Sequence, residues 1–153
     1  MTLAPLTQAQ QTSVDGLVRA SRLRVVRRDA AKAARFLAIA DERAADLPVM
    51  KSEVLRHDVA YDIAHDIGEA FLAAYGYATV NGPGQHAVIG DFLVIVIDAP
   101  PAAARAAKGF DQTRRNRNQS HYDAAPIGAG QAAGAVQLAQ DLRTAAASRG
   151  VGS

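Results

Sequence analysis

Residues 50–75 read MKSEVLRHDVAYDIAHDIGEAFLAAY and form the longest periodic stretch of the chain. Its apolar residues recur at steps of three and four: Val54, Leu55, Val59, Ile63, Ile67, Ala70, Phe71 and Ala74. At about 100° per residue, this spacing places them on one face of a helix. We therefore expect one long helix with a buried stripe, ended by Gly76.

Two helical segments precede this stretch. The apolar residues of 14–26 roughly follow helical spacing, and Asp29 is suited to cap a second helix over 30–45. The sequence leaves open whether the two fuse into one long helix, which Pro48 would end. Residues 1–13, rich in Thr, Gln and Ser, are expected to form a flexible leader.

Three helical segments follow, after a turn at 81–84. Residues 85–97 include the β-prone run 92–97, which we interpret as helix because it continues a helical pattern and no partner strand is expected elsewhere. Further helices are predicted over 102–122, with a glycine as a weak point, and over 129–147.

The composition favours the same architecture. Alanine is abundant, aromatic residues make up 5% of the chain and tryptophan is absent, which favours close-packed helices over a sandwich or barrel. A chain of 153 residues is long enough to bury a core in one domain. We expect an all-α fold, an antiparallel bundle of five to six helices in a single domain over residues 14–148.

Several classes of protein are excluded or disfavoured. The absence of cysteine excludes disulfides, thiolate zinc sites and cysteine nucleophiles. A net charge of +2 is too small to indicate a nucleic-acid partner by itself. The chain starts without a basic-then-apolar signal, and its longest strongly apolar run, Phe92 to Ile97, is too short to span a bilayer. We expect a cytoplasmic protein without membrane contact.

A polar cluster stands late in the fifth predicted helix, where residues 113–122 read TRRNRNQSHY. On a helix, its residues at i, i+3, i+4 and i+7 share one face, and these are Arg114, Arg117, Asn118 and His121. That face offers two guanidinium groups for phosphate oxygens, an amide, and a group that titrates near neutral pH. Cleavage of RNA needs these groups and can proceed without a metal. The alternative is a solvated basic helix face.

Residues 19–35 form a second basic region with one acid, Asp29. Its basic side chains are Arg19, Arg22, Arg24, Arg27, Arg28, Lys32 and Arg35. Two local basic surfaces on a nearly neutral protein are compatible with contact to RNA. The alternatives are a solvated face, or a structural helical protein whose basic first segment binds an acidic partner.

The order of these parts resembles a HEPN domain, an all-helical family of RNases and toxin components. The resemblance covers residues 29–147 and rests on the helix with 61–72, the turn 81–86, the cluster 114–122 and the last alanine-rich helix. It is closest to the SAV-6107-like branch, whose late helix carries an Arg-Asn-x-x-acid-Tyr run. The letters RNQSHY match that run, with His121 in the place of the acid.

In active HEPN RNases, an arginine is followed after four to six residues by a histidine. Five residues separate Arg115 from His121 and six separate Arg114 from it, whereas Arg117 leaves three, so the acting arginine stays open. The resemblance implies a metal-independent endoribonuclease that acts as a homodimer, with two copies of this helix forming one cleft. The implied products carry a 2′,3′-cyclic phosphate and a 5′-hydroxyl.

The resemblance also implies roles for single residues. The catalytic candidates are Arg114, Arg115, Asn116, Arg117, Asn118 and His121. His121 would transfer a proton, the arginines would stabilise the transition state, and an asparagine would orient the phosphate. Tyr122 would contact a phosphate or stack on a base, or else pack its ring on the bundle. Asp62, Asp66 or Glu69, from the longest helix, would hold an arginine in place.

The implied partners are RNA, a second copy of the chain and a small nucleotidyltransferase-like antitoxin. The alternative is a non-catalytic HEPN bundle that binds RNA, a nucleotide or a protein. His57 and His65 lie near several aspartates, but such helical mixtures usually are solvated or satisfy each other, and no His-Glu-x-x-His pattern occurs. We expect no metal and no cofactor.

Overall fold

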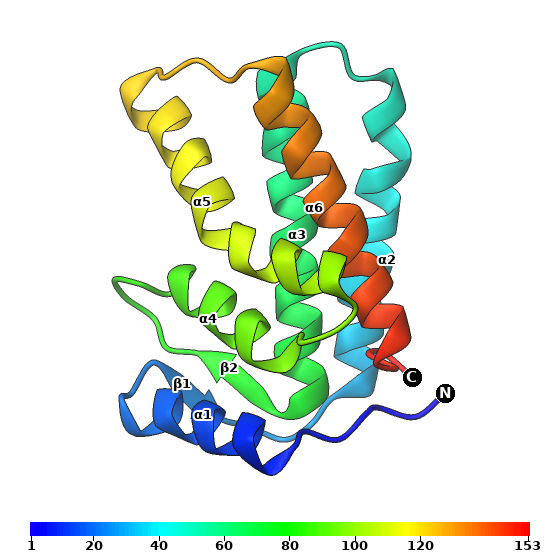
Figure 1. The fold of residues 1–153 in the computed structure, drawn as a ribbon, viewed down its shortest axis with the longest axis vertical. Helices are drawn as coiled ribbons and strands as arrows, with labels where there is room; N and C mark the ends of the chain where they lie inside the picture. Colours follow the sequence, from blue (N-terminus) through cyan, green and yellow to red (C-terminus); the bar gives the residue numbers. More distant parts are fainter.

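The computed structural model describes residues 1–153 and contains six α-helices, one 3₁₀ turn and two short strands (Figure 1). In chain order, the elements are α1 (Gln8–Arg19), β1 (Leu23–Val25), α2 (Ala30–Asp46), η1 (Leu47–Val49), α3 (Glu53–Tyr75), β2 (Tyr77–Thr79), α4 (Ala87–Val96), α5 (Pro101–Asp123) and α6 (Ala129–Ser148). The predicted helical bundle is confirmed.

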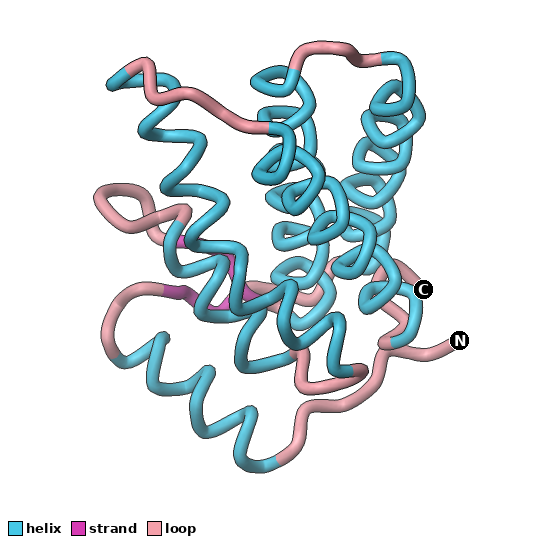
Figure 2. Tube along the Cα trace, turned by 45° about the horizontal axis from the view of Figure 1, so that its top comes forward, coloured by secondary structure: helices cyan, strands magenta, loops and turns pink.

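Helix α3 lies at the centre of the bundle. It packs against α2 and α6, which run beside it, and also contacts α4 and α5 (Figures 1 and 2). The predicted stripe is buried at Ile63, Ile67 and Phe71. Val54 and Leu55 are instead exposed, Leu55 by 57%, because they lie in the first turn of the helix.

Small residues let the neighbouring helices come close to one another. A Cβ atom added at Gly68 of α3 would collide with the side chain of Ile89 in α4. At Gly90 of α4, an added Cβ atom would lie 3.0 Å from the ring of Phe110 in α5. These two contacts place the first half of α4 against both α3 and α5. The polar cluster lies further along α5, at residues 113–122.

The first residues differ from the expected flexible leader. Helix α1 begins at Gln8, because the side chain of Thr7 accepts a hydrogen bond from the backbone of Gln10 and the Gln10 side chain bonds back to Thr7. Ala4 donates to the carbonyl of Arg149 over 2.8 Å, which holds the two chain ends together (Figure 1). The leader is therefore packed against the bundle.

The structure also contains a pair of short strands that the all-helical prediction does not include. Leu23–Val25 pairs antiparallel with Tyr77–Thr79, with Arg24 opposite Ala78. This strand separates α1 from α2, so the two predicted helices do not fuse. Each strand has three residues, which are too few to show the alternation typical of a strand.

Most other predicted boundaries are confirmed. The side chain of Asp29 accepts from the backbone N–H of Lys32 over 2.8 Å and caps α2, and Gly76 ends α3 in the left-handed region with φ 87°. Residues 92–96 are helical. No helix of the structure is both long and apolar enough to cross a membrane.

Helix α5 is continuous through Gly109 and bends near its middle (Figure 1). The hydroxyl of Thr113 donates to the carbonyl of Gly109 over 3.0 Å, a contact that commonly accompanies a bend in a helix. The second half of α5, which carries the polar cluster, runs past the first half of α3.

Candidate active site between helices α3 and α5

Two rows of polar side chains face each other where α3 and α5 meet. On α3, Asp58, Tyr61, Asp62 and His65 follow the i, i+3, i+4, i+7 spacing that gives one helix face. Nε2 of His121 lies 3.0 Å from Oδ2 of Asp58. The helices run antiparallel, so further along, the Arg117 guanidinium meets Asp62, at 3.8 Å between Nη2 and Oδ1. We call these two rows the α3–α5 seam.

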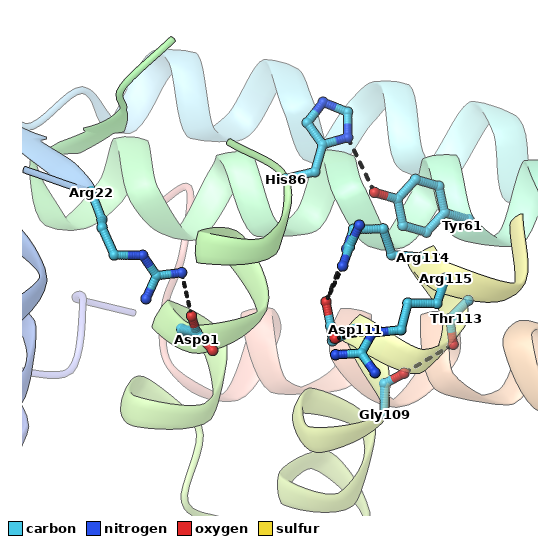
Figure 3. Close-up of polar contacts among 9 residues, drawn as sticks. All are labelled: Arg22, Tyr61, His86, Asp91, Gly109, Asp111, Thr113, Arg114 and Arg115. Atoms are coloured by element: carbon cyan, nitrogen blue, oxygen red, sulfur yellow. Dashed lines mark hydrogen bonds and ion pairs between the residues drawn. The ribbon is translucent and has the colours of Figure 1, made fainter. Parts of the chain in front are cut away.

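Tyr61 lies at the base of the seam. Its ring is buried, 5.1 Å below the guanidinium of Arg117 and 5.6 Å from the ring of Phe110. Its hydroxyl is directed at His86, 3.3 Å from Nδ1 (Figure 3). The His86 ring in turn lies 4.7 Å from that of His65. The seam therefore reaches into the loop that precedes α4.

A pocket of about 360 Å³ opens at this junction. It is lined by Gly82, Gly84, Gln85, His86, Ala87, Arg114, Arg117, Asn118 and Tyr122. The lining is mostly polar and contains two guanidinium groups, two amides and an imidazole. Such a set suits a phosphate and the sugar attached to it. Tyr122 is 84% exposed and could present its ring to a base.

The structure separates the predicted residues into two groups. Arg114, Arg117, Asn118 and Tyr122 meet in the pocket, and His121 lies one helical turn from Arg117, beside Asp58. The prediction that Arg114, Arg117, Asn118 and His121 share a face of α5 is confirmed.

Three predicted residues lie elsewhere. Arg115 is 61% exposed, and its Nε lies 2.8 Å from Asp111. Asn116 accepts from the side chain of Gln112 over 2.9 Å, on the same outer side of α5. Asp66 forms an ion pair with Arg43 of α2 and does not approach the arginines of the cluster. Of the two predicted aspartates, Asp62 alone lies beside Arg117.

Sequence reasoning missed several members of the site. His86 immediately precedes α4 and is part of the pocket. Asp111 contacts both Arg114 and Arg115 (Figure 3). Asp58 and Tyr61 lie on the same face of α3 as Asp62, and this helical spacing predicts that they belong to the site with it. No comparable signal exists for His86, because its position depends on how the loop folds back over α5.

Buried polar atoms without a hydrogen-bond partner in the protein concentrate in this region. They are Nδ1 of His57, Oδ1 of Asp58, Nε2 of His65 and Nε of Arg117. Each such atom costs about 1–3 kcal/mol of stability, and native proteins contain few of them. All four belong to α3 and α5. A cost concentrated in one place is typical of a functional site.

Desolvation lowers the pKa of two histidines at this junction, His65 and His86. Desolvation, followed by the neighbouring His86 and Arg117, lowers the pKa of His65 to about 4. Desolvation, followed by Arg117 and Arg114, also lowers the pKa of His86. Burial raises the pKa of Tyr61 to about 12. Near neutral pH, these two imidazoles and the phenol are therefore uncharged beside cationic guanidinium groups. No three His, Asp or Glu side chains converge as metal ligands would.

No protein-family model, curated protein or solved structure matches the chain. The chemistry of the seam is therefore the basis for inferring function.

Proposed function

We propose that the protein is a metal-independent endoribonuclease of HEPN type that cleaves RNA at the α3–α5 seam. One observation carries the proposal: two guanidinium groups, two amides and an imidazole line one pocket, and His121 lies one helical turn from Arg117, beside Asp58. Arg114 and Arg117 would bind the scissile phosphate and stabilise the charge that develops on it, an effect that often dominates catalysis. Asn118 would orient the phosphate.

His121 would transfer a proton in this reaction. Asp58 lies against Nε2 and fixes the ring, so that Nδ1 remains for the substrate. The ring is 42% exposed at the end of α5, where a second copy of the chain can reach it. We propose a homodimer in which two copies of α5 line one cleft. In the cytoplasm, such an enzyme would act as a toxin or defence component held in check by a nucleotidyltransferase-like antitoxin.

The experiment is cleavage of single-stranded RNA by the purified protein in excess EDTA, with the product ends mapped. We expect 2′,3′-cyclic phosphate ends, and a loss of about 100- to 10,000-fold in the rate for His121→Ala. Arg143→Ala is the control, because Arg143 pairs with Asp41 beside α2, away from the pocket. Cleavage that His121→Ala leaves unchanged would contradict the assignment. A protein that cleaves RNA as a monomer would contradict the shared cleft.

The second candidate function is a non-catalytic module that binds RNA or a nucleotide. A specific observation favours it: His121 is engaged by Asp58 and is not part of the pocket lining, whereas the phosphate-binding groups are. Under this alternative, the wild-type protein binds RNA with strong salt dependence and releases no products in the same assay.

A further inference from the structure

We propose that His86 is a second catalytic residue, the general base that takes the proton of the ribose 2′-hydroxyl. This inference rests on the proposed ribonuclease function and adds to it a residue outside the polar cluster of α5. Its basis is that the pocket itself contains one imidazole, that of His86, between the glycine-containing loop and the two arginines.

The geometry leaves one nitrogen of this ring available. Nδ1 of His86 lies 3.3 Å from the Tyr61 hydroxyl, whereas Nε2 forms no hydrogen bond within the protein (Figure 3). When Nδ1 carries the proton and donates a hydrogen bond to the Tyr61 hydroxyl, Nε2 presents a lone pair to the pocket. A base needs this tautomer, in which the Tyr61 hydroxyl oxygen accepts the hydrogen bond from Nδ1–H. Tyr61 is therefore a positioning residue.

The charged and titratable groups around His86 favour an uncharged ring. Arg114 and Arg117 face it from α5, and Tyr61 and His65 face it from α3. No carboxylate pairs with it. His121 has a different partner, because Oδ2 of Asp58 lies 3.0 Å from its Nε2. His86 lines the pocket and is assigned the role of base, and His121, one helical turn from Arg117, is assigned the role of acid.

The reaction balances with these two groups alone. Nε2 of His86 takes the proton of the 2′-hydroxyl while that oxygen forms a bond to phosphorus. The bond between phosphorus and the 5′-oxygen breaks, and His121 gives its proton to the departing oxygen. The products are a 2′,3′-cyclic phosphate and a 5′-hydroxyl. Exchange of protons with water restores both rings, without oxidation or reduction.

The test compares His86→Asn with the wild type in RNA cleavage in EDTA across pH 5–9. His86 precedes α4 with an exposed side chain that caps no backbone group, so the variant is expected to fold. We expect its rate under saturating RNA to fall by about 100- to 10,000-fold, with RNA affinity changed by less than about threefold. The acidic limb of the pH–rate profile, which reports protonation of the base, should disappear. Tyr61→Phe should keep this limb and lose about tenfold in rate.

Other outcomes distinguish the two proposals. If the wild type cleaves RNA and His86→Asn retains its rate and its acidic limb, His86 is not the base and the ribonuclease stands. If His86→Asn lowers RNA affinity and the rate under saturating RNA is unchanged, His86 is a binding residue and the proposal is overturned. If the folded wild type cleaves no RNA, the ribonuclease and the role of His86 are both rejected.

Discussion

The two sides of α3 differ in how well their polar groups are paired. Toward α2 and α6, it borders a pocket of about 510 Å³ lined by residues such as Leu47, Ile63 and Ala139. The ion pair at that pocket is well formed, because Nε and Nη2 of Arg143 both bond the carboxylate of Asp41, at 2.7 and 3.0 Å. Toward α5, α3 presents the seam, with one long ion pair, Arg117–Asp62, and unpartnered buried atoms. The first side stabilises the bundle, and the second carries the cost of buried polar atoms without partners.

The difference is sharpest between the arginines of α5. Arg117 is 29% exposed and lies over Tyr61 in the pocket, and Arg115 is exposed on the outer side. We expect Arg117→Ala to lower RNA cleavage by about 100- to 1,000-fold, the usual cost of removing one group that stabilises transition-state charge. Arg115→Ala, which removes the same charge from α5, should change it by less than about threefold. Equal losses in the same cleavage assay would mean that only net charge matters.

Adjacent residues of α3 test the comparison through stability. Ile63 is buried on the side of α2 and α6, and Asp62 faces Arg117 on the seam. Ile63→Ala should lower the free energy of unfolding by about 2–4 kcal/mol, because it removes buried methyl groups and leaves a cavity. Asp62→Asn should change it by less than about 1 kcal/mol, since the ion pair is long and partly exposed. Urea denaturation measures both, and a larger cost for Asp62→Asn would contradict the assignment of the two sides.

The lowered pKa of His65 predicts how the stability of the fold depends on pH. The pKa of His65 is about 4 in the folded protein and lies near 6.5 in an unfolded chain. As the pH falls, the unfolded chain therefore binds the proton first, and the folded state loses stability between about pH 6.5 and 4. The loss attributable to His65 is up to about 3 kcal/mol. Urea denaturation from pH 7.5 to 4 should show a shallower decline for His65→Gln. An identical decline would mean that His65 is solvated.

The sequence predicts the helices of the bundle well for a physical reason. The 50–75 stretch carries its own helical repeat, and Asp29 and Gly76 mark helix ends through local hydrogen bonding and backbone conformation. The sequence does not predict the β1–β2 pairing, because each strand has three residues and depends on a distant partner. The start of α1 at Gln8 depends on the Thr7–Gln10 capping box, a short signal within a polar stretch.

The site was predictable in part for the same reason. Helical spacing alone groups Arg114, Arg117 and His121 on one face of α5. Helical spacing does not say which face of α5 turns toward α3, the one with Arg117 or the one with Arg115. The packing of α5 on the bundle decides which face does so. His86 belongs to the site only because its loop folds over α5. Asp66 forms an ion pair with Arg43 of α2 and so lies away from the cluster. These features depend on contacts between elements, which no local pattern encodes.

The central claim is that RNA binds at the seam and not on the other side of α3. The most direct measurement is an NMR titration of the wild-type protein with a short single-stranded RNA whose 2′-hydroxyls are methylated, so that it cannot be cleaved. The account predicts shifts in the backbone amides of residues 82–87 and 114–122, with those of α2 and α6 around Asp41 and Arg143 unchanged. Shifts confined to α2 and α6, or to the basic region 19–35, would contradict it.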